Sequence, residues 1–396
     1  MPSFTSHEGL RENLQVFFNS IHCESFFYKS LLPAKILISL KIRLLKLEAL
    51  RGFAALYVLL HHVSSSYLGL KSSFVGFPFR FGQEAVLVFF LLSGFVIHYS
   101  FQLSPRQDFA DYLIKRARRI YPIFIIALFL SLLTAFFCAD VFICGDILRS
   151  FLGNMLMLQD HPGRPSPWFL PFCGNDPLWS LAYEWWFYML YFPLTKFCPA
   201  RWQKVLVFSL AGIGIAFDSF FPNPPFHYLA LLPVWWFGVE MAKEYLASGR
   251  ITLCGQRTYL FLLLVPLIFY LTVALEWHFC GKPLALIAYP LVDLRYFVST
   301  LGLFFMALIW RQFDFVGYEI LSRPFIFIGT ISYALYVFHY PLILRLRLFG
   351  DNHLFYVDLF LRLLLAFALS FVVEQYFQPW INRLTSSWAN KPPRNQ

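Results

Sequence analysis

Long apolar runs recur along the chain, and short stretches that carry most of the charge separate them. A helix that crosses a membrane needs about 20 mostly apolar residues, and ten ranges approach that length. Two of them, 177–197 and 325–348, contain polar residues and proline, so hydropathy ranks them lower. The pattern predicts an all-α membrane protein of about ten transmembrane helices. The predicted spans are 50–69, 83–101, 119–138, 177–197, 204–221, 227–246, 258–275, 293–310, 325–348 and 354–377.

The spans are predicted to form one membrane domain, residues 47–385. A basic extension of unclear role, residues 1–46, precedes it, and its segment Leu31–Leu47 is typical of an amphipathic helix at a membrane surface. A short basic tail, residues 386–396, follows. The longest connection, 139–176, is rich in Pro, Gly and Asp and contains one short amphipathic piece, Ile147–Leu158.

Composition supports a membrane protein, because 59% of the residues are hydrophobic, 14% are charged and the mean hydropathy is +0.60. Soluble domains carry about 25% charged residues, so a soluble enzyme is nearly excluded. The net charge of +10 would also suit a nucleic-acid binder. However, 23 of the 32 Lys and Arg residues fall on the side of the predicted membrane that holds both termini, and 8 fall on the other. This bias predicts that both termini are cytoplasmic and that nucleic acid is not a partner.

The 7 cysteines contain no CxxC pair and no zinc-like spacing. They are therefore predicted to be free thiols in an apolar protein. The alternative is a disulfide among Cys138, Cys144, Cys173 and Cys280, if their segments face an oxidising compartment.

Ionisable residues within a span are rare and suggest a functional site. Arg51 and His62 are 11 residues apart in the first span. That spacing is within about 20° of three full helical turns and rises roughly 16 Å, so both side chains share one helix face. The alternatives are a snorkelling anchor for Arg51 and a packed core histidine for His62.

The third span is preceded by Arg116 and Arg119, which point the same way at i,i+3. They suit either an anchor at the cytoplasmic surface or a clamp for the phosphates of an anionic ligand. Glu184 lies about two turns into the fourth span and must be protonated, paired or facing water. Trp179, Tyr183 and Trp186 form a separate stripe on that span, which packing explains best.

The ninth span places Ser332 and His339 seven residues apart on one face, and Pro341 is predicted to kink this helix. In the tenth span, Asp358 and Arg362 at i,i+4 are expected to form a structural ion pair. Three further polar residues are noted: Tyr333 beside Ser332, Glu374 one turn from the cytoplasmic exit, and Glu240 near the membrane interface.

The interior set of imidazole, guanidinium, carboxylate and phenol lacks the patterns of a serine nucleophile, a metal site or a nucleotide-binding loop. A buried His beside a carboxylate suits general-base activation of a hydroxyl, and an Arg pair suits a phosphorylated donor. The set predicts group transfer within the membrane, with no metal. A proton-coupled transporter, which lines its path with the same residue types, stays open.

Five motifs in order resemble the acyltransferase 3 family, the O-antigen acetylase type of integral membrane acyltransferase, from about Leu47 to Trp380. The sequence departs from the family at Leu87, where many relatives carry an acidic residue, and at Tyr376, where the last motif has proline. The five motifs are Leu50-Arg51-Gly52 followed by His62, Phe89-Phe90-Leu91-Leu92-Ser93-Gly94-Phe95, Arg116-x-x-Arg119 with Tyr121-Pro122, Trp179-Ser180-Leu181 through Glu184 to Tyr188, and Gly329 through Ser332-Tyr333 to His339-Tyr340-Pro341.

The resemblance implies a multi-pass protein of the bacterial cytoplasmic (inner) membrane that moves an acyl group, expected to be acetyl, to a hydroxyl of a glycan or lipid-linked sugar. The donor would be cytoplasmic acyl-CoA, with no permanently bound cofactor. The other readings are acylation of a non-sugar small molecule and a transporter or flippase for an acylated or anionic solute.

By the same resemblance, each site residue receives an expected role. Arg116 and Arg119 would hold the donor, and Arg51 would assist or polarise the thioester. His62 would act as general base or as a transient acyl acceptor, and Glu184 would orient the imidazole or line the acceptor site. The expected substrate-binding or supporting residues are Ser332, Tyr333, His339 and Glu374.

Overall fold

A computed structural model describes residues 34–69, 74–138, 144–313, 315–349 and 354–389. The protein is all-helical, with 80% of its residues in helices and no strand within those ranges. The helices are α3 (Ala34–His62), α4 (Gly82–Gln102), α5 (Phe109–Phe137), α6 (Ile147–Met155), α7 (Trp179–Lys196), α8 (Ala200–Phe220), α9 (Pro224–Ser248), α10 (Leu253–Phe279), α11 (Leu291–Gln312), α12 (Tyr318–Thr330), α13 (Ser332–His339), α14 (Phe355–Val372) and α15 (Gln378–Ala389).

Each of the ten predicted spans contains helix, but fewer are long and apolar enough to be recognised as membrane spans from length and composition. Six helical segments within the described residues meet that standard, and a bent pair raises the number to seven. The predicted fourth span, α7, is not among them, as its polar residues led us to expect. The structure thus supports a helical membrane protein with six or seven recognisable spans.

Side-chain caps fix where several helices begin. The Asp108 carboxylate accepts a hydrogen bond from the Asp111 N–H at the start of α5, at 2.9 Å. The Thr252 hydroxyl accepts one from the Gly255 N–H at the start of α10, at 3.0 Å. Short polar side chains at this position satisfy N–H groups that have no partner within the helix, so the polar connections set the helix boundaries.

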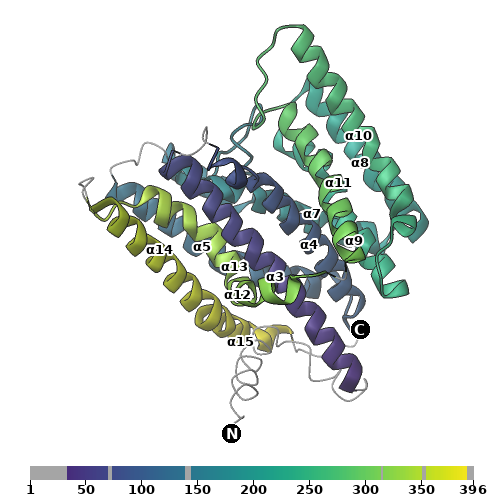
Figure 1. The fold of residues 1–396 in the computed structure, drawn as a ribbon, viewed down its shortest axis with the longest axis horizontal. Coiled ribbons are helices and arrows are strands. Elements are labelled where there is room, and N and C mark those ends of the chain that lie inside the picture. The colour runs from purple at the N-terminus through teal and green to yellow at the C-terminus, as the bar shows by residue number, and fades with distance from the viewer. Residues whose placement is uncertain (1–33, 70–73, 139–143, 314, 350–353, 390–396) are drawn as a thin grey trace.

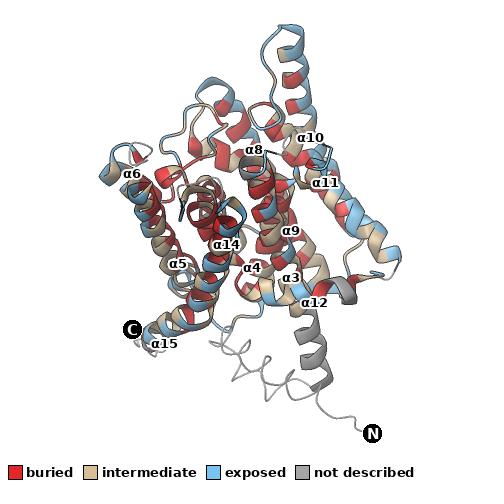
Figure 2. Cartoon of the chain, turned by 60° about the vertical axis from the view of Figure 1, so that its left-hand side comes forward, coloured by how far each residue is buried: buried red, intermediate tan, exposed pale blue. Residues whose placement is uncertain are grey.

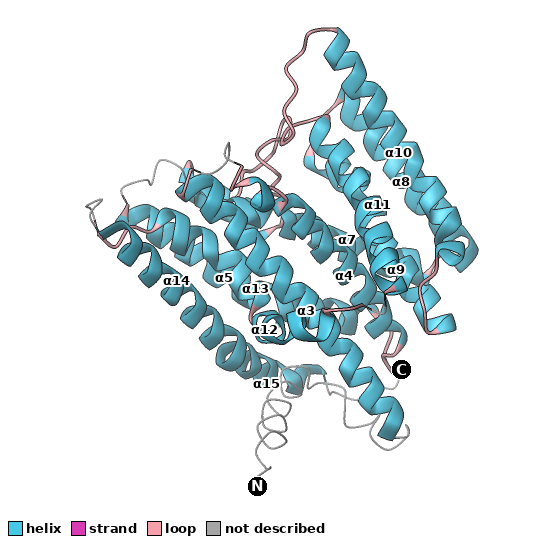
Figure 3. Ribbon diagram, viewed as in Figure 1, coloured by secondary structure: helices cyan, strands magenta, loops and turns pink. Residues whose placement is uncertain are grey.

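The helices lie side by side, with α14 at one flank, α10 at the opposite flank and α3, α4 and α7 between them (Figure 1). Figure 3, in the same view, shows that loops join the helices mainly at their ends. Two helix pairs cross at glycines. A Cβ at Gly94 of α4 would overlap the Trp235 carbonyl oxygen of α9, and one at Gly238 would overlap the Leu91 carbonyl oxygen. Only glycine therefore allows these backbones to approach so closely.

A similar crossing joins α3 and α12. A Cβ at Gly52 would overlap the Phe325 carbonyl oxygen, and one at Gly329 would overlap the Glu48 carbonyl oxygen. Small residues let helices pack closely in a membrane, where the hydrophobic effect does not drive them together. The glycines of three sequence motifs thus have a packing role.

Burial is concentrated on the central helices, whereas the outer helices expose apolar side chains (Figure 2). On α10, for example, Phe261 is 69% exposed and Val265 is 61% exposed; on α14, Phe360 is 63% exposed. Exposed apolar faces of this extent mark contact with a membrane or a partner, and their position on span-length helices points to lipid.

The N-terminal prediction is tested only in part. Helix α3 begins at Ala34, so residues 34–46 continue into the first span as one helix across the predicted boundary at residue 47. The remainder of the predicted extension, residues 1–33, and most of the tail, residues 390–396, lie outside the described residues.

The 139–176 connection contains α6, as the amphipathic pattern predicts, and a disulfide between Cys144 and Cys173. The prediction of free thiols is wrong for this pair, because the fold brings together two cysteines 29 positions apart. Cys138 and Cys280, the other two candidates, are free.

Candidate functional site

The first and ninth predicted spans face each other along a polar seam, formed by α3 on one side and α13 with its continuation on the other. At one end, Arg51 lines a small cavity together with Ser332 and Tyr333. At the other end, the His62 ring lies 5.3 Å from the His339 ring, measured between centroids. Because α3 is continuous from Arg51 to His62, the prediction that the two share one helix face is confirmed.

The small cavity has a volume of about 110 Å³ and is lined by α3, α4, α5, α7 and α13. It collects six of the nine residues predicted to form the site, from four separate spans. A seventh, Glu374, reaches it indirectly through an ion pair with one of the lining arginines. The six predicted residues that line it are Arg51, Arg116, Arg119, Glu184, Ser332 and Tyr333.

Three guanidinium groups at this cavity differ in their partners. Arg51 Nη1 lies 3.0 Å from Glu48 Oε1. Arg119 Nη1 lies 2.7 Å from Glu374 Oε2, and that glutamate side chain is only 3% exposed. Arg116 has no carboxylate within ion-pair distance among the described residues; its guanidinium lies over the Tyr112 ring, 5.8 Å from the centroid. Arg116 is therefore the arginine whose charge is most available to a ligand.

Glu184 lines the cavity and accepts a short hydrogen bond from the Tyr188 hydroxyl. Ser93 Oγ lies 2.9 Å from the same hydroxyl and donates to it, because the phenol proton is used on the carboxylate. Among the described residues, no hydrogen bond or ion pair joins Glu184 to His62. The expectation that Glu184 orients this imidazole is therefore not met, and its other expected role, lining a substrate site, fits its position.

The two seam histidines lie one layer beyond the cavity. His339 is 1% exposed; its Nδ1 lies 3.2 Å from the Leu335 carbonyl oxygen, while its Nε2 has no hydrogen-bond partner in the described part of the chain. His62 packs against the Tyr340 ring at 5.3 Å, and neither of its nitrogens is hydrogen-bonded to a described residue. The Tyr340 hydroxyl donates to Asp176, at 3.0 Å. Free imidazole nitrogens are what proton transfer requires.

The bend in the ninth span is not where the proline predicts it. The pieces Ser322–Thr330 and Ser332–Arg345 meet at 74°, and the break is at Ile331. Pro341 lies instead in a π-helical stretch, Tyr340–Arg345. The wider turn accommodates the missing N–H without a sharp kink. Because the break precedes α13, it directs Ser332 and Tyr333 into the cavity.

One prediction about the tenth span concerns an ion pair. Arg362 Nη2 lies 2.6 Å from Asp358 Oδ2, which confirms the structural pair. The Arg362 guanidinium also donates to the carbonyl oxygens of Ile343 and Leu346, both at 2.6 Å. These bonds tie α14 to the end of the ninth span, and neither Asp358 nor Arg362 lines the cavity, so this pair supports the fold.

A buried charge network escaped the sequence analysis. It joins the 139–176 connection to α8, α9 and α11, and all five members are at most 5% exposed. His227 is hydrogen-bonded to Asp160 through Nδ1, and its Nε2 lies close to the Asp218 carboxylate, so a carboxylate flanks each ring nitrogen. The contacts are His227 Nδ1 with Asp160, His227 Nε2 with Asp218 at 2.6 Å, Arg164 with Asp293, and Arg164 Nη1 with Asp218 at 3.7 Å.

Three of these residues lie near the ends of predicted spans, where charge is expected to meet water, so no local signal identifies the network. It bears on the site through Tyr183, whose hydroxyl donates to Asp160 at 2.6 Å. Burial alone would raise the pKa of the Asp160 carboxyl, but the hydrogen bond and charge of His227 and the charge of Arg164 lower it. Tyr183 precedes Glu184 on α7, so the network anchors the helix that carries this carboxylate.

Within the ranges the structure describes, no group of three His, Cys, Asp or Glu side chains is arranged to hold a metal ion. The arrangement that remains offers a cationic end, a carboxylate hydrogen-bonded to a phenol, and two imidazoles along one seam. Chemically, such a set can hold an anionic ligand and move a proton to or from a hydroxyl.

Comparison with known proteins gives a family match. The model of the acyltransferase domain of the acyltransferase 3 family matches residues 44–377. ORF330 of Acidianus two-tailed virus, named as a proposed acetyltransferase, is 26% identical over 344 residues, which cover 83% of this chain and 90% of the relative. No solved structure matches.

Two bacterial relatives are longer than the matched region. Acyltransferase MdmB of Streptomyces mycarofaciens is 30% identical over 184 residues, 44% of this chain and 45% of the relative. Peptidoglycan O-acetyltransferase OatA of Listeria monocytogenes is 22% identical over 335 residues, 75% of this chain and 49% of the relative. The matched regions span about half the length of these two relatives.

Proposed function

Because this chain belongs to the acyltransferase 3 family, we propose that it is a multi-pass membrane O-acyltransferase that moves an acyl group, acetyl in the first instance, from acyl-CoA to a hydroxyl of a glycan or glycolipid. The observation that supports this function most directly is the α3–α13 seam, which has arginines at one end and His62 with His339 at the other. Relatives named as O-acetyltransferases support acetyl as the group and a peptidoglycan-like glycan as the acceptor class.

We further propose ten membrane crossings with both termini in the cytoplasm of a bacterial cell. Each predicted range contains helix, and the Lys and Arg bias supports the orientation. This topology assigns the 139–176 connection to the outside. The Cys144–Cys173 disulfide in that connection agrees with it, because disulfides persist in oxidising compartments.

In this proposal, the cationic end of the seam receives the donor from the cytoplasm. Arg116 contacts the phosphates, since no carboxylate in the described residues neutralises it, and Arg119 and Arg51 contribute from the same cavity. Glu374 and Glu48 hold those two guanidinium groups in place. Charge-assisted bonds from arginine to phosphate are strong and directional, so donor affinity resides largely here.

His62 is the proposed general base. The acceptor hydroxyl attacks the thioester carbonyl carbon while His62 takes the hydroxyl proton. The C–S bond then breaks, and the proton leaves with the CoA thiolate as a thiol. His339, whose Nε2 is free and whose ring is 5.3 Å away, supports His62. Glu184, Ser332 and Tyr333 line the cavity where the acyl group would pass.

The test uses membranes or nanodiscs supplied with radiolabelled acetyl-CoA and a peptidoglycan or lipid-linked sugar acceptor. His62→Ala is expected to abolish label transfer while the thermal unfolding midpoint stays near that of the parent. His61→Gln is the matched control, because the Nδ1 of this neighbouring imidazole lies 2.6 Å from the Phe79 carbonyl oxygen and is already engaged.

Full transfer by folded His62→Ala would remove this residue from its role. A parent protein that never releases CoA, but moves solute across the bilayer, would overturn the acyltransferase proposal in favour of a transporter. Label that stays on the parent protein, is released by hydroxylamine and is absent from His62→Ala would identify His62 as an acyl acceptor instead of a base.

A further inference from the structure

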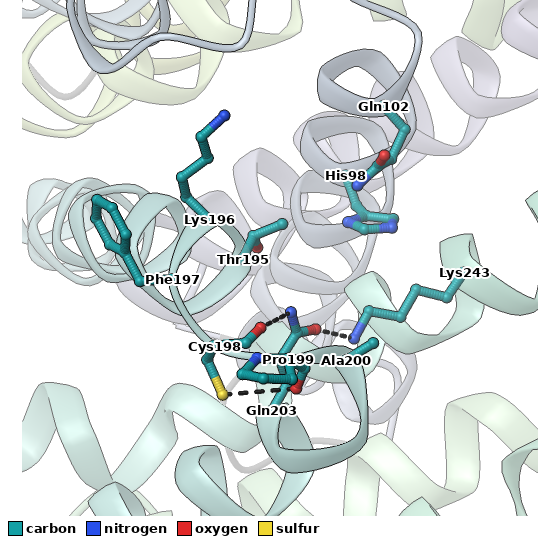
Figure 4. Close-up of a pocket in the computed structure, with 10 residues that line it drawn as sticks. All are labelled: His98, Gln102, Thr195, Lys196, Phe197, Cys198, Pro199, Ala200, Gln203 and Lys243. Atoms are coloured by element: carbon teal, nitrogen blue, oxygen red, sulfur yellow. Dashed lines mark hydrogen bonds between the residues drawn. The ribbon is translucent and has the colours of Figure 1, made fainter.

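A second and larger cavity, of about 520 Å³, opens where α4, α7 and α9 end and α8 begins (Figure 4). Its volume lies within the usual range of small-molecule sites. Its polar lining comes from four helices, and none of its lining residues is acidic. The polar side chains are His98 and Gln102 of α4, Thr195 and Lys196 of α7, Gln203 of α8, and Lys243 of α9.

The cavity has a surplus of positive charge. Lys243 Nζ lies 2.6 Å from Glu240 Oε1 and 2.6 Å from Gln203 Oε1, as the dashed line to Gln203 in Figure 4 shows. Lys204 Nζ lies 3.3 Å from the other oxygen of Glu240, so one buried carboxylate is shared by two ammonium groups. Lys196 adds a third ammonium at the rim.

The remaining lining is rich in hydrogen-bond donors. His98 is 4% exposed, and its Nδ1 lies 2.9 Å from the Tyr191 hydroxyl, which leaves Nε2 as the second polar atom of the ring. Gln102 adds an amide, and Thr195 adds a hydroxyl. Ammonium, amide and hydroxyl donors without a carboxylate suit the oxygens of a phosphate.

This cavity is distinct from the one at the seam. A layer of aromatic contacts separates them: His98 contacts Tyr191, Tyr191 stacks on Tyr112 at 5.8 Å, and the Arg116 guanidinium lies over Tyr112. The two cavities share no lining residue, so the second cavity is a separate candidate site.

We propose that the second cavity binds the phosphate headgroup of an anionic phospholipid in the cytoplasmic leaflet. The proposal rests on the orientation given under Proposed function. Phe197, beside Lys196, is 76% exposed, and Trp202 is 54% exposed; exposed aromatic rings are typical of the interface between membrane and water. Basic pockets between spans on the cytoplasmic side are suited to anionic headgroups.

The experiment measures binding of phosphatidylglycerol to the full chain in nanodiscs of phosphatidylcholine, by native mass spectrometry or a fluorescent lipid. Lys196→Glu is expected to weaken this binding about ten- to thirtyfold. A basic residue near a lipid surface contributes about 1 kcal/mol to the binding free energy, and reversing its charge doubles the change in that energy. Arg257→Glu is the matched control; this exposed arginine is at the same end of the bundle, on α10, outside the cavity.

Equal affinity in the parent and Lys196→Glu, or an equal loss in Arg257→Glu, would overturn the lipid site. A second arm titrates CoA in neutral nanodiscs. If Lys196→Glu weakens CoA binding and leaves phosphatidylglycerol binding unchanged, the cavity belongs to the donor and the lipid assignment is wrong. Absence of acyl transfer in the parent would refute the proposed function alone, because lipid binding is read without turnover.

Discussion

Replacing Arg116 by methionine is the sharpest probe of the donor site. Methionine keeps an unbranched apolar side chain that can pack on Tyr112 but removes the guanidinium. Because no carboxylate in the described residues pairs with Arg116, the change leaves no buried partner uncompensated. Arg119 would be a poor probe, since its loss strands Glu374, which is 3% exposed. The loss of Arg119 would therefore destabilise the protein by leaving a buried carboxylate without its charged partner.

The expected loss of donor affinity follows from the bond that Arg116 would make. A hydrogen bond to a charged group contributes about 1.5–3 kcal/mol, and each 1.4 kcal/mol corresponds to a factor of ten. The KM for acetyl-CoA should therefore rise about 10- to 150-fold. The kcat should change little, because Arg116 binds phosphate in both the ground state and the transition state.

The assay follows release of free CoA thiol by the full chain in nanodiscs, over a range of acetyl-CoA concentrations. Arg118→Met is the matched control, because this arginine is two residues away on α5 and donates instead to the Asn382 carbonyl oxygen, at 2.7 Å. Its KM should stay near the parent value. An unchanged KM in Arg116→Met, or an equal rise in both variants, would refute the assignment of Arg116 to the donor.

Three further predictions concern the scaffold. Gly94→Ala should destabilise the protein by about 1–3 kcal/mol, because the added Cβ would overlap α9. Gly212→Ala is the control and should be neutral or stabilising, because nothing lies within 4 Å of its added Cβ. Equal melting temperatures of the two variants would contradict this prediction. Arg164→Met should cost about 3–5 kcal/mol, and adding Asp293→Asn should recover part of the loss in a double-mutant cycle. Burial and the charge of Arg164 lower the pKa of His161 to about 4. Its folded form therefore binds a proton less readily than the unfolded chain, whose histidines titrate near 6.5, and stability should fall as pH drops from 6.5 to 4. Replacing His161 by asparagine should flatten that part of the pH profile in thermal melts.

The sequence predicts much of the candidate site because several of the site residues are related by short spacings along a single helix. Arg51 and His62 share a face by helical periodicity alone, and the structure confirms it. Arg116 and Arg119 likewise follow from an i,i+3 spacing, and both line the cavity. What spacing cannot supply is the partner: Glu374 is 255 residues from Arg119 in sequence, yet its carboxylate is 2.7 Å away.

The buried network shows the limit most clearly. Asp160, Arg164, Asp218, His227 and Asp293 come from four separate segments, and each has an ordinary local context near a loop. Their mutual burial depends on long-range packing, which hydropathy and periodicity do not report. The Cys144–Cys173 disulfide is a second case, because connectivity among scattered cysteines depends on which segments the fold brings together.

The amino-acid sequence by itself determined that this is a helical membrane protein, where its helices lie and which polar side chains share a helix face. These properties follow from the cost of placing polar groups in lipid and from the 3.6-residue period of the helix. Only the tertiary structure decided that Glu374 pairs with Arg119, that the bend precedes Ser332, and that a second basic cavity exists. These properties depend on contacts between distant segments, and such contacts are set by how the helices pack.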